Sequence, residues 1–188
     1  GNSTLFLSNN SLQRTNTLVI NGGGVVGLSR EGLNAMAGLS DGGTGDATGV
    51  LSGPSDRGYL DIAGSGNYRY SGVVTGFAFL NMQGPGTQTL SNANSFFGQN
   101  SGTAVFLSGG QLALDFSGPV STAAINPGQD VLYHTPSDAN AAGTPGGATG
   151  NAQWGVALQG GKLTLLGATG AANVQHFGSM SLGGGAST

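Results

Sequence analysis

The sequence predicts an all-β fold in which the chain winds into the stacked coils of a parallel β-helix, or β-solenoid. The first observation is a repeated unit of strand, Gly-Gly turn and strand, found at 107–114 and 158–165, with a looser copy at 20–28. The second is that leucines in this unit alternate with polar or small residues, as in half-buried strands. The third is that short β-type runs recur along the chain and end at Gly, Asn or Ser.

A sandwich or barrel built from hairpins is the competing architecture. Hairpins favour Asn-Gly or Asp-Gly between their strands, whereas here Gly-Gly pairs join strands that share the same apolar pattern. The repeat spacing therefore favours the solenoid.

The composition fits one weakly charged body. The 188 residues show no break in composition, so we expect a single solenoid segment over 1–188, forming one unit of a longer array or of a head-to-tail fibre. Only 7% of the residues are charged and the net charge is −3, so the chain lacks the basic face that nucleic acid requires. It has no cysteine, which excludes disulfides and thiolate metal sites, and no apolar run approaches a membrane span.

The strands are expected in short runs along the whole chain. In order, apolar, β-branched and aromatic residues predict them at 4–7, 17–20, 59–62, 77–82, 87–90, 104–107, 111–116, 154–158, 162–166 and 174–182. A coil of roughly 20 to 25 residues gives about eight coils. Alternation places Leu112, Leu114, Phe116, Leu163 and Leu165 in the core, stacked against the coils above and below.

Three stretches interrupt this rhythm. Residues 41–56 and 137–151 are rich in Gly and small polar residues, which predicts loops that leave the coil. The run 29–39 predicts a short helix with Leu33, Met36 and Ala37 on one face, although Gly32 weakens it.

Residues 84–116 carry a family resemblance. The matching positions are Gly86-Thr87, Leu90-Ser91, Ala93-Asn94, Phe96 or Phe97, Gly98 and Gly109-Gly110-Gln111-Leu112, and the departures are Gln88, Asn92 and Gln99-Asn100. This pattern resembles the passenger-associated transport repeat of bacterial autotransporter-type surface proteins, and 161–188 looks like a segment that closes one repeat block. The close match covers about a sixth of the chain. The resemblance implies a right-handed β-helix outside the cell, with adhesive or fibrous use.

A dinucleotide-binding turn is one alternative use of the early glycines. Gly22, Gly24 and Gly27 form G-x-G-x-x-G after a strand and before the possible helix, which locally resembles flavin-dependent oxidoreductases. No second strand ends in an acidic residue at the right distance, and the alternating helices of a doubly wound fold are missing. The sequence favours a coil turn, so we expect no cofactor.

Two clusters of ionisable residues raise the question of a metal or catalytic site. Residues 42–46 approach the calcium-binding repeat G-G-x-G-x-D, but Asp46 comes one position early and the motif does not recur. An ordinary loop is favoured, and whether Asp41 and Asp46 bind calcium stays open.

The second cluster is Asp130, His134 and Asp138. A spacing of four along a strand separates Asp130 from His134 by about 13 Å, too far for a direct bond. A surface loop is favoured here, and a structural role is favoured for His176. We therefore expect no catalytic, cofactor-binding or metal-binding residues in the chain.

Glycan chemistry is the remaining alternative, because polysaccharide lyases and glycoside hydrolases also use β-helices with carboxylates gathered on one outer face. Asp61 and Asp115 are the candidates that alternation turns outward. Exposed aromatic residues could stack on sugar rings, and the candidates are Tyr59, Tyr68, Tyr70 and Trp154, although the sequence favours core packing or strand-edge filling for most of them.

The sequence thus predicts a structural or adhesive, non-enzymatic β-solenoid of a bacterial cell-surface or extracellular fibre protein. The alternative is a glycan-binding or glycan-cleaving β-helix. An open coil end presents unpaired backbone and apolar surface, so we expect self-association through the ends, with residue 188 leading toward strand 4–7 of the next copy. A glycan or a cell surface is a further candidate partner; nucleic acid and membrane insertion are not expected.

Overall fold

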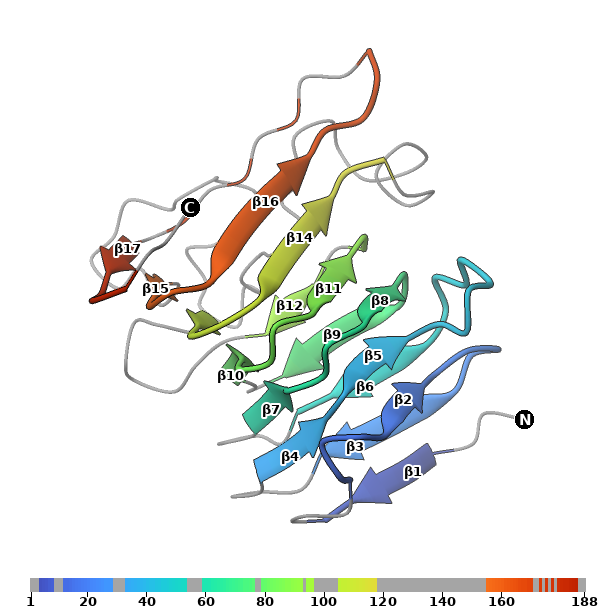
Figure 1. Ribbon diagram of the computed structural model, residues 1–188. Coiled ribbons are helices and arrows are strands. Elements are labelled where there is room, and N and C mark those ends of the chain that lie inside the picture. The colour runs from blue at the N-terminus through green and yellow to red at the C-terminus, as the bar shows by residue number, and fades with distance from the viewer. Residues whose placement is uncertain are drawn as a thin grey trace, which may run out of the picture.

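The computed structural model is a stack of parallel β-strands that forms a β-solenoid of about five turns (Figure 1). It describes residues 4–8, 12–28, 33–53, 59–76, 79–92, 94–96, 105–117, 155–170, 173, 175, 177 and 179–185. In this part of the chain all strand pairs are parallel and no helix occurs, which confirms the predicted all-β solenoid. Among these residues, therefore, none forms a helix of the length and apolarity needed to cross a membrane.

The strands fall on three faces of the solenoid. Sheet I contains, in spatial order, β1 (Thr4–Leu7), β3 (Val25–Leu28), β6 (Val50–Ser52), β9 (Val73–Gly76) and β12 (Ser95–Phe96). Sheet II contains β4 (Leu33–Met36), β7 (Tyr59–Ile62), β10 (Phe79–Met82), β13 (Val105–Leu107), β15 (Gly155–Leu158) and β17 (Ser179–Leu182). Sheet III contains β8 (Asn67–Tyr70), β11 (Thr87–Leu90), β14 (Gln111–Asp115) and β16 (Lys162–Leu166).

A separate pair, β2 (Thr17–Val19) and β5 (Gly38–Ser40), lies beside sheet III. The Asp41 N–H that follows β5 donates to the Arg69 carbonyl of β8 (3.1 Å), so the two groups of strands belong to one face. A full coil thus places one strand on each face in turn.

The core consists of aliphatic rows that run from coil to coil. On sheet II the register aligns two such rows, none of whose members is more than 5% exposed: Leu60, Leu80, Val105 and Val156; and Ile62, Met82, Leu107 and Leu158. Each side chain packs on its counterparts in the neighbouring coils, and each Å² of apolar surface removed from water contributes roughly 25 cal/mol. Repeated burial of this kind stabilises a chain that has no cysteine.

The predicted core residues are confirmed except at the last described strand of sheet III. Leu112 and Leu114 are fully buried and Phe116 is nearly so. Leu163 is only partly buried and Leu165 is 50% exposed, so placing Leu165 in the core is wrong. The reason is position, because β16 pairs with β14 on one side and has no pairing strand on the other among the described residues.

The Gly-Gly turns let successive coils approach closely. Gly110, between β13 and β14, has φ +57°, a left-handed conformation that glycine adopts without steric cost. A Cβ at Gly110 would lie 2.3 Å from the carbonyl oxygens of both Gly84 and Gly86 in the preceding coil. The turn therefore needs glycine for its conformation and for its contact with the coil below.

The helix predicted over 29–39 is wrong, because 33–40 form β4 and β5. Neighbouring coils offer both segments parallel partners, β7 for β4 and β2 for β5, and a helix this short has little stability of its own. Gly38 also lies under the Tyr68 ring, and a Cβ at Gly38 would stand 2.1 Å from an atom of that ring.

Two other expectations need correction. The loop predicted over 41–56 contains β6, which pairs between β3 and β9, so residues 50–52 belong to the coil. The estimate of eight coils is too high, because β13 and β15 are neighbours in space although about 50 residues separate Val105 from Gly155. The loop predicted over 137–151 lies outside the described residues.

Candidate functional site

Asp61, one of the two carboxylates predicted to face outward, lies in β7 and is only 2% exposed. Its oxygens accept hydrogen bonds from Asn81 Nδ2 (3.0 Å) and Gln83 Nε2 (3.1 Å). Burial raises the pKa of this carboxyl, against the opposing effects of the Asn81 amide, the Arg14 charge and the Gln83 amide. Asp61 is therefore held by amides of the next coil.

Asp115 in β14 is also buried, and its partners are charged or hydroxylic. It forms an ion pair with Arg69 and accepts from the Ser117 N–H (2.8 Å) and hydroxyl (2.6 Å). Burial raises its pKa, but the hydrogen bonds from Ser117 and Arg69 and the charge of Arg69 together outweigh burial, so the pKa is lowered. Asp61 lies on sheet II and Asp115 on sheet III, so the structure does not bring the two predicted carboxylates together as an acid–base pair.

We expect the solenoid to lose stability on acidification, in part through Asp115. Because the folded pKa lies below the unfolded value of ~3.9, its contribution is complete above that value and is lost as the pH falls through the folded pKa. The difference in Tm between the wild type and Asp115→Asn should be widest at neutral pH and shrink in acid. Arg69→Gln should reproduce the neutral-pH loss, whereas a difference that is constant with pH would mean that Asp115 contributes through packing alone.

The aromatic residues proposed for sugar stacking are engaged within the solenoid. Tyr59 stacks on Phe79 of the next coil, with ring centroids 5.0 Å apart and planes 16° from parallel. The Tyr68 ring packs against the backbone of β5. Tyr70 is fully buried, so the prediction that it is exposed is wrong, and Trp154 lies outside the described residues.

The early glycines form a turn between two strands. The Gly24 N–H donates to the Asn21 carbonyl (3.0 Å), and Gly22 and Gly23 between them have φ +59° and +73°. Gly27 then lies within β3. A dinucleotide site needs a helix after this turn, so the geometry supports the coil turn.

Asp41 begins the loop after β5, yet its side chain belongs to the interior. It is fully buried. When the register of the neighbouring strands is continued by one residue, Asp41 lies between Ile20 of the previous coil and Tyr70 of the next. Its two oxygens accept from the Gly43 N–H (2.9 Å) and the Ser71 N–H (3.1 Å). The sequence holds a signal for this placement, because Asp41 follows Leu39 by two positions as Ile20 follows Leu18.

Asp46, at the far end of the same loop, joins two coils. Its Oδ1 accepts from the Thr48 N–H (2.8 Å) and hydroxyl (2.6 Å), and its Oδ2 accepts from the Gly22 N–H of the previous coil. The Thr48 hydroxyl, the Thr48 N–H and the Gly22 N–H lower its pKa, in that order of effect. The carboxylate thus fixes the loop to the turn below it.

Tyr70 brings an unsatisfied hydroxyl to this region. Its Oη is buried without a hydrogen-bond partner among the described residues. Burial, and then the charges of Asp41 and Asp46, raise its pKa. The Oη lies 2.5 Å from where a Cβ on Gly72 would stand, and the Gly49 carbonyl oxygen lies 2.3 Å from the same point. The tip of the phenol therefore reaches the segment whose Ser71 N–H binds Asp41. The sequence pattern did not predict that Tyr70 and Asp41 lie in the same buried region.

Further buried polar groups continue this region into the next coil. Asn92 Nδ2 donates to the Ser71 carbonyl (2.9 Å) and the Ala47 carbonyl (3.2 Å), and Asn94 Oδ1 accepts from the Val74 N–H (2.8 Å). We call the group the polar corner; its members are at most 5% exposed and comprise Asp41, Tyr70, Ser71, Ser91, Asn92 and Asn94.

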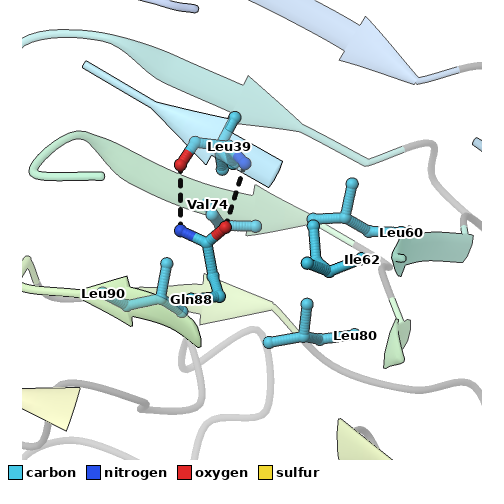
Figure 2. A pocket seen from close by; sticks show the side chains of 7 residues that line it. All are labelled: Leu39, Leu60, Ile62, Val74, Leu80, Gln88 and Leu90. Atoms are coloured by element: carbon cyan, nitrogen blue, oxygen red, sulfur yellow. Dashed lines mark hydrogen bonds between the residues drawn. The ribbon is translucent and has the colours of Figure 1, made fainter. Parts of the chain in front are cut away.

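A small apolar cavity lies in the middle of the stack, and Gln88 lies at its edge (Figure 2). The Gln88 side chain is 1% exposed; its Oε1 accepts from the Leu39 N–H and its Nε2 donates to the Leu39 carbonyl, both at 2.9 Å. It thereby satisfies the backbone of β5 where β5 and β8 form no ladder. The cavity of about 10 Å³ is the size of one water and no larger ligand, and its other lining residues are Leu39, Leu60, Ile62, Val74, Leu80 and Leu90.

The remaining candidates, Asp130, His134, Asp138 and His176, lie outside the described residues. Within the described part, no three His, Cys, Asp or Glu side chains come together as a metal-binding group. Comparisons with protein-family models, with curated proteins and with solved structures find no match to this chain.

Proposed function

We propose that this chain is a non-catalytic, structural or adhesive β-solenoid of a bacterial cell-surface or extracellular fibre protein, and that copies join end to end. The observation that carries the proposal is where the solenoid exposes apolar side chains. Among the described residues, all the exposed large hydrophobic side chains lie in β1, β2, β16 and β17: Leu5, Phe6, Val19, Leu165, Leu166, Met180 and Leu182. The likeness of 84–116 to autotransporter passenger repeats supports the cell-surface location.

These strands lie at opposite ends of the stack, β1 and β2 at one end and β16 and β17 at the other (Figure 1). Exposed apolar side chains at a strand edge, together with unpaired backbone groups, favour addition of another strand. The sides of the solenoid carry no such side chains in the described residues. The attractive surfaces are thus the two ends.

Strand direction favours head-to-tail joining of two copies. All strands of a face run the same way, so β2 of one copy can extend the face that ends at β16 of another only in this orientation. The aliphatic rows would then continue across the junction. A head-to-head contact would reverse the strands and break the rows.

The carboxylates argue for a non-catalytic role. Asp61 and Asp115 lie on different sheets, and each is hydrogen-bonded within the solenoid. Glycoside hydrolysis needs a facing pair of carboxylates. A rod that binds surfaces needs only its regular face and its ends.

The end-to-end contact predicts a mixing experiment. Val19→Lys should block one end and Leu165→Lys the other, because each places a charge where an apolar side chain is 50% exposed. The wild type should form oligomers that grow with concentration, each variant alone should remain monomeric, and their mixture should yield a one-to-one dimer through the two intact ends. Light scattering coupled to size-exclusion chromatography measures the masses.

Asn67→Lys provides the matched control, because Asn67 is exposed on the side of the solenoid and its substitution should leave assembly unchanged. Dimers of either end variant alone would indicate head-to-head joining, and a monomeric wild type would contradict the proposal. Polysaccharides incubated with the same protein should show no new reducing ends; turnover would favour the glycan-cleaving alternative.

A further inference from the structure

We propose that Asn21 is a site of self-modification, at which the backbone nitrogen of Gly22 attacks the Asn21 carboxamide while the Asp46 carboxylate acts as general base. Ammonia leaves, and the cyclic imide that forms is opened by water to aspartate or isoaspartate. The site goes beyond the end-to-end assembly and does not depend on it. It lies on the turn between β2 and β3, where the loop after β5 contacts the previous coil.

The first support is the pair of residues itself. Ring closure joins the side chain of one residue to the backbone nitrogen of the next, so a side chain on the second residue obstructs it, and glycine has none. Asn21-Gly22 is the only Asn-Gly pair in the chain. Both residues are exposed, and a Cβ at Gly22 would have no atom within 4 Å. The approach to the Gly22 nitrogen is therefore open.

The second, independent support is the carboxylate that binds the reacting proton. The Gly22 N–H donates to Asp46 Oδ2, while the Thr48 N–H (2.8 Å) and hydroxyl (2.6 Å) hold Asp46 Oδ1. A general base must lie within hydrogen-bond reach of the proton that it removes. The bonds from Thr48 and Gly22 also lower the pKa of Asp46, which keeps this carboxylate ionised at neutral pH. Asp46 is therefore both charged and fixed on the proton of the attacking nitrogen.

The third support is the freedom of the Asn21 side chain. The Asn21 backbone carbonyl accepts from the Gly24 N–H (3.0 Å), but the carboxamide makes no hydrogen bond to the residues that the structure describes. It can turn toward the Gly22 nitrogen without breaking a bond to them. The bond between this nitrogen and Asn21 Cγ then forms, the N–H proton passes to Asp46, and the bond from Cγ to Nδ2 breaks. Asp46 returns the proton to the leaving nitrogen, which departs as ammonia.

The next coil provides an internal comparison, because Asp41-Gly42 is the only Asp-Gly pair in the chain and an aspartate can close the same ring. Asp41 is fully buried, and its oxygens accept from the Gly43 and Ser71 N–H groups. The Gly42 N–H donates to the Ser40 hydroxyl oxygen (3.0 Å) rather than to a carboxylate. Both reacting groups are thus engaged, so we expect Asp41 to stay unchanged where Asn21 reacts.

The test incubates the whole folded chain at neutral pH in water enriched in heavy oxygen, and then digests it with trypsin. Cleavage after Arg14 and Arg30 releases the peptide 15–30, which contains both Asn16 and Asn21. Tandem mass spectrometry should find heavy oxygen in a new carboxyl group at Asn21, as a mixture of aspartate and isoaspartate. The isoaspartate is diagnostic, because direct hydrolysis of the carboxamide yields aspartate alone. Asn16, which precedes a β-branched threonine, should keep its amide.

Variants of Asp46 test its role as the base. Asp46→Asn should slow the conversion of Asn21 on the order of 10²-fold, the lower end of what a general base contributes. Asp46→Glu keeps a carboxylate and should restore part of the rate. Asp61→Asn, at a buried carboxylate on sheet II, should leave the rate unchanged. In urea the wild type and Asp46→Asn should react equally fast, because Asp46 no longer contacts Gly22.

Two results would overturn the proposal. The first is a folded wild type that keeps its Asn21 amide while the urea-unfolded chain loses it. The second is folded Asp46→Asn protein that reacts as fast as the wild type or faster, which would mean that the bond from Gly22 to Asp46 only holds the turn in place. Neither result bears on the end-to-end assembly, whose test measures mass alone.

Discussion

Gly110→Ala should destabilise the solenoid by about 4 kcal/mol, since two separate penalties add. The left-handed backbone at φ +57° disfavours a side chain by roughly 1–2 kcal/mol. The new Cβ would also meet two carbonyl oxygens of the preceding coil at 2.3 Å, and no side-chain rotation can relieve a contact with backbone. Urea denaturation followed by circular dichroism measures the loss.

Two other glycines separate these penalties. Gly22 has nearly the same φ, +59°, but a Cβ there has no atom within 4 Å, so Gly22→Ala should show the conformational cost alone. Gly184 has neither a positive φ nor a near neighbour, so Gly184→Ala should be close to neutral. Equal losses for Gly110→Ala and Gly22→Ala would refute the close approach of coils at this turn.

Gln88→Leu should also be strongly destabilising, by about 2–5 kcal/mol, although leucine is the residue found at the paired position 112. The substitution gains apolar surface but leaves the N–H and the carbonyl of Leu39 without the bonds that Gln88 makes at 2.9 Å. Two buried backbone groups that lose their partners each cost about 1–3 kcal/mol. Thermal unfolding gives the size of the effect, and faster hydrogen exchange of the Leu39 amide gives its location.

Gln88→Met tests the cause, because it keeps the length of the side chain and removes only its amide; it should lose nearly as much as Gln88→Leu. Gln159→Leu is the matched control, since Gln159 is exposed and its change should stay within about 0.5 kcal/mol. A Gln88→Leu protein as stable as the wild type would show that the two hydrogen bonds contribute little.

The parts of the fold that the sequence predicts are those in which local pattern and coil packing agree. Leu112 and Leu114 alternate with small or polar residues and follow a Gly-Gly turn, so the sequence predicts the strand, its inward side and its turn. The strands β6 and β8 lack such a signal, because Val50–Ser52 lies among glycines and Asn67–Tyr70 is mostly polar. Parallel neighbours hold both in place, and packing of this kind outweighs weak intrinsic preference.

The polar corner and the buried Gln88 escape prediction for a related reason. Asp41 and Gln88 occupy inward positions that the apolar pattern assigns to aliphatic side chains, and their partners lie 30 and 49 residues away in sequence. A search for alternating leucines skips such positions. Only the register of the coils shows that Asp41 meets Tyr70 and that Gln88 satisfies Leu39.

Several side-chain bonds connect coils that are not adjacent, and this sets how the molecule comes apart. Gln88 binds Leu39, Asn92 binds Ala47, and Arg69 binds Asp115, each across an intervening strand of the stack. In an ordinary solenoid each repeat contacts only its neighbours, and unfolding can stop between any two. Here the three spans overlap, so residues 39–115 should melt as one cooperative unit while the apolar end coils fray first.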